Sequence, residues 1–397
     1  MRVPFYRPSI GREEIDEVVN TLESGWLTTG PKTAEFERAF RSYVGAPSAL
    51  AVSSCTAGLH LALAAMNIGA GDEVITTPLT FCSTVHVILH TGATPVLADV
   101  GQDGNIDPAA VAARMTPRTR AILPVHLAGL PVEMNQIWEL AKRHRLRVIE
   151  DCAHAAGACY QGVPVGGGNP EQGWYSDAAA FSFYATKNLT TGEGGMVTTH
   201  DEEIANKLKI LCLHGISKDA WNRYSDKGNW YYEVLEPGFK YNLSDIQSSI
   251  GIHQLKKLEH FTETRGRYAR LYNELLADVD ELELPPDRCD SRHAWHLYML
   301  RINLEKLSIG RDEFIELLRE KGVGTSVHFI PIPLHPFFSA RRAGNECPQA
   351  LSLYKRLVSL PLYPGMTEDQ VVHTAESVKD LARKFRSPRT ILERVRV

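Results

Sequence analysis

The chain alternates short apolar runs with longer segments in which apolar residues recur at helical spacing. The apolar runs have the length of buried strands, and they lie at residues 49–53, 74–77, 94–100, 121–125, 147–151, 178–183 and 195–199. The spacing of the first five leaves room for crossover helices, as parallel strands require. This pattern predicts an α/β domain with a mostly parallel sheet that is covered by helices on both faces.

The carboxyl-terminal part shows a different pattern, which predicts a smaller α+β domain. Its clearest pieces are a strand at residues 295–302, a helix at 311–321 and a segment at 324–329. A chain of 397 residues is long enough for two cores, because single cores stop growing beyond roughly 250 to 300 residues. We therefore predict a large domain at residues 1–255 and a small domain at residues 256–397.

Two helices are predicted outside this alternation. Residues 11–22 place Ile15, Val18, Val19 and Leu22 on one helical face. A second helix follows Ser244 and is expected to run, with breaks, toward residue 276.

One lysine follows a buried strand where a core would not accept it. The apolar run at residues 178–183 leads into a loop rich in Thr and Gly, and this loop carries Lys187. A lysine amine that has lost its proton can condense with an aldehyde, as in the Schiff base that anchors pyridoxal phosphate. A loop lysine is more often a solvated charge. Whether Lys187 is a surface charge or a reactive amine must therefore be inferred from the residues around it.

Ligands of a parallel sheet gather beyond the carboxyl ends of its strands, and three of these ends carry candidate residues. Ser54, Cys55 and Thr56 open a helix, which is typical both of a phosphate site and of an ordinary N-cap. Phe81 follows another strand and belongs either to the core or to a wall that stacks on a flat ring.

The strand at residues 147–151 ends in two carboxylates and is soon followed by a histidine. A carboxylate such as that of Asp151 can keep a pyridine nitrogen protonated, which makes the ring an electron sink. His154 could reach the phenolic oxygen of the same ring, although a lone histidine is more often a satisfied core or surface residue.

Charge and cysteine usage exclude several classes of function. The 43 Lys and Arg residues against 47 Asp and Glu leave a net charge of −4, which favours neither nucleic acid nor an anionic membrane as a partner. The seven cysteines contain no C-x-x-C pair and fit free thiols better than disulfides or a metal site. Neither a signal peptide nor a membrane-spanning run is predicted, so we expect a cytoplasmic protein.

These candidates occur in one order along the chain, with Ser182 five residues before Lys187 and a Gly192-Glu193-Gly194-Gly195 turn after it. The order resembles the DegT/DnrJ/EryC1/StrS family of sugar aminotransferases, which are pyridoxal-phosphate enzymes of fold type I. The resemblance covers nearly the whole chain and is densest at residues 23–32, 71–76, 117–119 with 124–126, and 149–155. Residues 237–243, 293–297 and 322–325 with 327–329 are most similar to the branch that aminates C4 of UDP-4-keto sugars, typified by UDP-4-amino-4-deoxy-L-arabinose aminotransferase.

The resemblance implies pyridoxal 5'-phosphate as the cofactor and a role for each matching residue. Lys187 bonds to the cofactor and moves the proton during transfer. Asp151 pairs with the ring nitrogen, His154 lies near the phenolic oxygen, and Phe81 stacks on the ring. The phosphate is held at the strand-to-helix turn and by a serine before the lysine: Ser54, Cys55, Thr56 and Ser182.

The resemblance also implies a homodimer in which Lys240 reaches across to the partner's active site. L-Glutamate and a nucleotide-linked 4-keto sugar, carried by UDP or dTDP, are the implied substrates, for amino-sugar or cell-envelope polysaccharide biosynthesis. The residues expected to line the substrate pocket match family segments that contact the sugar nucleotide: Trp26, Thr28, Tyr184, His328 and Phe329.

The chain departs from the family pattern at several of these positions. Lys240 and Asn242 stand where many members have Asn and Arg, Tyr184 where the most similar branch usually has His, and Phe81 where it often has Trp. These departures leave the sugar open. Three alternatives are a sugar dehydratase, which would carry histidine in place of Lys187, a non-catalytic regulator with a degraded site, and a cyclitol or amino-hydroxybenzoate aminotransferase.

Overall fold

The computed structural model describes residues 1–169, 173, 175–217, 231–339 and 347–387. Its centre is a seven-stranded sheet with the strand order β1-β9-β8-β5-β4-β2-β3. The strands are β1 (Ser48–Val52), β2 (Glu73–Thr76), β3 (Thr94–Leu97), β4 (Thr119–Leu123), β5 (Arg147–Asp151), β8 (Ala178–Ser182) and β9 (Gly195–Thr199). Among the described strands of this sheet, β9 runs antiparallel to its neighbours β1 and β8, and the other pairs are parallel. The predicted mixed, mostly parallel sheet is confirmed.

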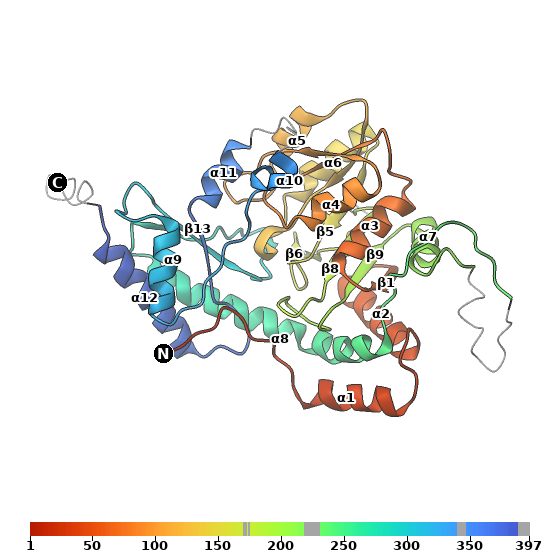
Figure 1. Ribbon diagram of the computed structural model, residues 1–397, viewed down its shortest axis with the longest axis horizontal. Coiled ribbons are helices and arrows are strands. Elements are labelled where there is room, and N and C mark those ends of the chain that lie inside the picture. The colour runs from red at the N-terminus through yellow and green to blue at the C-terminus, as the bar shows by residue number, and fades with distance from the viewer. Residues whose placement is uncertain (170–172, 174, 218–230, 340–346, 388–397) are drawn as a thin grey trace.

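Helices cover both faces of this sheet, as Figure 1 shows. One face is covered by α3 (Cys55–Ala65), α4 (Ser83–His90) and α7 (Glu202–Cys212). The other is covered by α2 (Pro31–Val44), α5 (Pro108–Arg114), α6 (Met134–His144) and part of α8 (Asp245–Leu276). The strands are apolar on both sides because neither face meets water.

A small sheet, β10-β12-β13, forms the carboxyl-terminal part together with two helices. Its strands are β10 (Leu282–Glu283), β12 (Tyr298–Ile302) and β13 (Leu357–Leu360), and its helices are α9 (Arg311–Glu320) and α12 (Glu368–Lys384). The remaining elements are short: β6 (Cys159–Tyr160), β7 (Val163–Pro164), β11 (Ser291–Arg292), α10 (Pro336–Ser339), α11 (Pro348–Tyr354) and 3₁₀ turns at Leu127–Gly129 and Ile332–Leu334. The predicted strand at 295–302 begins three residues late because Trp295 has a φ of 46°.

The helix α8 joins the two parts. It runs unbroken for 32 residues from a capping box between Ser244 and Gln247, so the expected breaks are wrong. It packs on α2 and α1 (Arg12–Glu23) along one stretch and on α12 along another. The domain boundary predicted at residue 255 lies inside this helix, and the amino-terminal Val3 pairs with Val323 of the small part. The division therefore stays a prediction.

The helix α1 buries a polar face instead of its apolar one. Glu14 is buried because its carboxylate accepts hydrogen bonds from Gln254 and Lys257 of α8 and from the Gly11 N–H. Ile15 and its apolar neighbours Val19 and Leu22 are consequently exposed in the single chain. No described helix is long and apolar enough to cross a membrane.

Candidate active site

The carboxyl ends of β1, β5 and β8 meet at one edge of the sheet and border a cavity of about 470 Å³. Most of the residues predicted for the site line it: Ser54, Cys55, Thr56, Phe81, Asp151, His154, Ser182, Tyr184, Lys187, His328 and Phe329. Parallel strands bring these segments together because their ends share one edge of the sheet.

Lys187 is half-buried in the loop that follows β8. Removal from water lowers the pKa of its ammonium from 10.5 to about 8, while the charge of Asp151 opposes this shift. A fraction on the order of a tenth is therefore free amine at pH 7, as nucleophilic attack on an aldehyde requires.

Asp151 ends β5, and its buried carboxylate is held in one orientation by two hydrogen bonds. The Thr84 hydroxyl donates to Oδ2 at 2.8 Å, the Ala153 N–H donates to Oδ1 at 3.0 Å, and the Cys55 thiol lies 3.7 Å from Oδ1. Burial raises the pKa of Asp151, although the hydrogen bonds and the charge of Lys187 counteract it. A buried carboxylate of this kind is stabilised by a cationic partner, such as a protonated ring nitrogen.

Sequence reasoning missed Thr84 of α4. Its hydroxyl hydrogen is used on Asp151, so the Thr80 hydroxyl, 2.8 Å away, must donate to Thr84. The two threonines thus form a short chain that fixes the carboxylate. No local signal in the sequence indicates a contact between residues 84 and 151.

The amino terminus of α3 provides free backbone donors. The Ser54 hydroxyl accepts from the Ala57 N–H at 3.0 Å, and the Gly58 N–H bonds to the Ser54 carbonyl. The N–H groups of Cys55 and Thr56 are thus left without a partner among the described residues. A Cβ at Gly195 would lie 2.7 Å from the Cys55 nitrogen, so only glycine lets β9 pass so close to this turn.

Three neutral histidines form another wall of the cavity. The ring centroids of His154 and His296 are 4.4 Å apart, and His154 also stacks on Phe329 at 5.7 Å. Burial lowers the pKa of His154 and His296 well below the ordinary value, and that of His328 to about 4. His296 belongs to the family segment at residues 293–297, but sequence reasoning missed its place in the site.

Three predicted site residues do not line the cavity of their own chain. Trp26 and Thr28 are exposed in the loop after α1, and Lys240 is exposed after α7. These two segments lie together, since the Asn242 amide donates to the Thr29 hydroxyl at 2.7 Å and the Lys240 ammonium lies 2.5 Å from Asn242 Oδ1. We call this surface, formed by residues 26–29 and 240–242, the outer patch.

One buried cluster has the composition of a metal site: His126, Glu150 and Cys152. Its histidine uses both ring nitrogens in protein hydrogen bonds, to the Val132 N–H at 3.0 Å and to the Glu150 carboxylate at 2.7 Å. Since no lone pair remains on the neutral ring, this cluster ties β4 and β5 together rather than offering a ready metal ligand.

Comparison with known proteins gives the family. The DegT/DnrJ/EryC1/StrS aminotransferase family matches residues 8–379. The chain belongs to this family. It is 49% identical over 385 residues to the spore coat polysaccharide biosynthesis protein SpsC of Bacillus subtilis, which covers 96% of this chain and 97% of the relative. The family membership that the sequence predicted is therefore confirmed.

Solved structures agree with this assignment. The PLP form of the sugar aminotransferase Spr1654 from Streptococcus pneumoniae superposes with a TM-score of 0.89 at 31% identity, covering 97% of this chain and 99% of that one. Helicobacter pylori PseC, an aminotransferase involved in the biosynthesis of pseudoaminic acid, gives 0.89 at 30% identity, covering 97% and 100%. The protein is thus a pyridoxal-phosphate-dependent sugar aminotransferase of fold type I.

The site fits this cofactor. The free N–H groups at the start of α3 suit the phosphate, the buried Asp151 carboxylate suits a protonated ring nitrogen, and the low pKa of Lys187 suits the aldehyde. The close approach at Gly195 keeps the phosphate end of the cavity open to backbone donors.

Proposed function

We propose that the protein moves an amino group from L-glutamate to a nucleotide-linked 4-keto sugar during polysaccharide biosynthesis. The observation that carries this proposal is a cavity lined by residues of two kinds. Some are suited to the cofactor, and the others, Tyr184, His328 and Phe329, are not needed to hold it. Aromatic and imidazole side chains are suited to bind a sugar ring and its hydroxyl groups.

The residues of this chain divide the work of transfer between them. Bound pyridoxal phosphate stores the amino group and withdraws electrons from the carbon that carries it. Lys187 would move the proton between that carbon and the C4′ carbon of the cofactor, because its amine is partly unprotonated at neutral pH. Asp151 keeps the ring nitrogen protonated, and His154 donates a hydrogen bond to the phenolic oxygen.

The proposal includes a homodimer with shared active sites, in which the outer patch of one chain faces the cavity of the other. Large aromatic side chains that line the cavity are exposed in the single chain, with Phe81 at 60% and Tyr184 at 46%. Exposed apolar groups gathered at one site indicate an interface. Lys240 would bring a positive charge to the phosphate, which has no cation from its own chain beyond Lys187 among the described lining residues.

The absorption spectrum of the purified protein tests the donor, and a panel of keto-sugar nucleotides tests the acceptor. We expect a visible cofactor band that L-glutamate bleaches and that returns when a nucleotide-linked 4-keto sugar is added. Lys187→Ala serves as the control: glutamate should not bleach its band, because the proton transfer that removes the band needs the lysine amine. Insensitivity of the native enzyme to glutamate would exclude this donor. Bleaching without return for any 4-keto sugar nucleotide, but with return for a keto-cyclitol, would exclude the proposed acceptor.

A further inference from the structure

Hydrogen bonding fixes the tautomer of His296, which is buried on the cavity wall. The side-chain amide of Asn188 donates to two carbonyl oxygens, those of Ala156 at 3.2 Å and Ala294 at 2.9 Å. Its own oxygen therefore faces Nδ1 of His296 at 3.0 Å. An oxygen can only accept, so Nδ1 of His296 carries the proton and Nε2 is a bare acceptor.

His154 has the opposite tautomer. The Ala128 N–H donates to its Nδ1 at 3.3 Å, which leaves the ring proton on Nε2. The same turn holds His296, because the Ala128 carbonyl accepts from the His296 backbone N–H at 2.9 Å. Ala128 has a φ of 58°, an uncommon backbone for alanine that makes both contacts possible.

The two neighbouring rings thus present one donor and one acceptor, and both line the cavity that Lys187 enters. When they are not bonded to Lys187, the two forms of the cofactor differ in hydrogen-bonding character. Its pyridoxal form carries an aldehyde oxygen, which only accepts, beside the phenolic oxygen. Its pyridoxamine form carries an amino group, which donates, beside the same oxygen.

We propose that His296 accepts a hydrogen bond from the amino group of pyridoxamine phosphate and thereby favours the amine-bearing form of the cofactor. His154 binds the phenolic oxygen in both forms, whereas only the amine gives Nε2 of His296 a donor. The proposal rests on the cofactor and is independent of the amino donor and the sugar proposed above. His296 is a specificity-determining residue for the cofactor state.

The test compares the dissociation constants of pyridoxal phosphate and pyridoxamine phosphate by calorimetry. Both are measured in the Lys187→Ala background, where neither form can bond to the lysine. We expect His296→Leu to weaken pyridoxamine phosphate about tenfold and pyridoxal phosphate less than about twofold. His296→Gln keeps an acceptor oxygen and is expected to recover most of the lost affinity.

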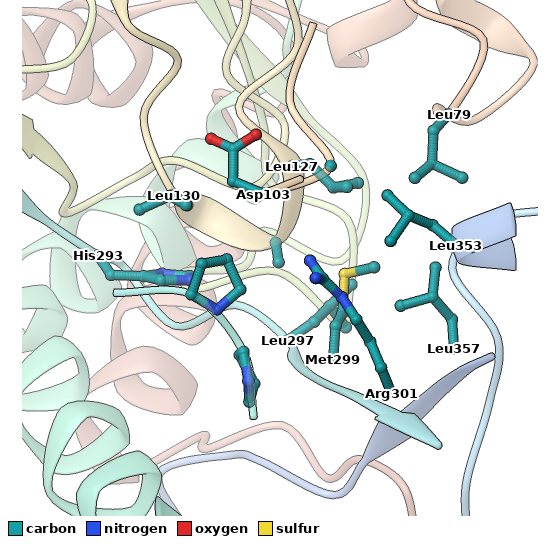
Figure 2. A pocket seen from close by; sticks show the side chains of 14 residues that line it. Leu79, Asp103, Leu127, Leu130, His293, Leu297, Met299, Arg301, Leu353 and Leu357 are labelled. Carbon is teal, nitrogen blue, oxygen red and sulfur yellow. The ribbon is translucent and has the colours of Figure 1, made fainter. Parts of the chain in front are cut away.

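The same segment offers a matched control. His293 is also buried, but it lines a separate cavity of about 20 Å³ between the two parts of the chain. Figure 2 shows its ring beside Leu130 in this second cavity. We expect His293→Leu to leave the ratio of the two constants unchanged. Equal weakening of both cofactor forms by His296→Leu, or a glutamine variant as weak as the leucine variant, would overturn the proposal.

Discussion

The cavity has an inner wall, which carries Asp151 and His154, and an outer rim, which carries Phe81 and Tyr184. A single chain buries the side chains of the wall but leaves those of the rim exposed. On the inner wall, Asp151 and His154 are buried, and hydrogen bonds within the chain hold the Asp151 carboxylate and Nδ1 of His154. On the rim, Phe81 is 60% exposed and Tyr184 is 46% exposed. One chain therefore encloses the inner wall, whereas the rim leaves large aromatic side chains exposed in the single chain.

The difference follows from where the residues originate. Inner residues lie at or just beyond the ends of parallel strands, which hydrogen bonds hold in register. Among the outer residues, Phe81 comes from the loop after β2 and His328 and Phe329 come from the small part, and the outer patch does not line its own cavity. Functional loops on a fixed scaffold are free to vary, which suits a family with a common cofactor and different sugars.

The largest effect is expected from Lys187→Ala on the inner wall. Without the amine, no group lies ready to take the proton, so turnover should fall by at least about 10⁴-fold. Steady-state kinetics with glutamate would measure this loss, and circular dichroism would show that the variant is folded. A loss of less than about tenfold would contradict the role of Lys187.

The pH dependence of Lys187 gives the next largest effect. Burial lowers its pKa to about 8, so the free amine is the main form above pH 8 instead of above 10.5. In the cofactor-free protein, acylation of Lys187 should accelerate about tenfold per pH unit below 8 and then level off. Mass spectrometry of the labelled peptide would follow the rate.

Two comparisons sharpen this measurement. Lys32, whose pKa is raised by its hydrogen bond to Glu17, should continue to accelerate beyond pH 10. Asp151→Asn removes a negative charge that raises the pKa of Lys187, so the midpoint should shift to lower pH. A midpoint near 10.5 in the parent protein would mean that the inner wall does not desolvate its lysine.

The rim is tested by restoring a site from two defective chains. Lys240→Ala alone should reduce turnover about thirtyfold, because a charge-assisted contact to the phosphate is lost. Co-expression with Lys187→Ala should return about a quarter of native activity, since half of the dimers are mixed and each has one intact site. Activity no higher than the mean of the two parents would show that Lys240 does not act across the interface.

The sequence predicted most of the inner wall because its signals are local. Apolar runs of strand length marked the sheet, and Asp151 and Lys187 stood where polar residues interrupt that pattern. The carboxyl ends of parallel strands then had to meet at one edge. The turn proposed to bind the phosphate was predicted from the residues that open α3 alone.

Other parts of the structure depend on contacts that no local pattern encodes. Thr84 and His296 reach the site through partners 67 and 108 residues away in the chain. The exposed apolar face of α1 reverses what amphipathic periodicity indicates, because ion pairing draws Glu14 onto α8. The unbroken α8 likewise shows that tertiary packing can override weak helix propensity.

The smallest effect, and the most specific test of the inner wall, is expected from Thr84→Val. Valine keeps the shape of threonine but cannot donate to Asp151, so the pKa of the carboxyl should rise further and the cofactor should bind about three- to tenfold more weakly. Thr84→Ser keeps the hydroxyl and should restore the affinity. Cofactor titration by absorbance would measure both. Because every other donor to Asp151 is unchanged, equal weakening by valine and serine would mean that Thr84 acts through packing and that the inner wall tolerates an imperfect network.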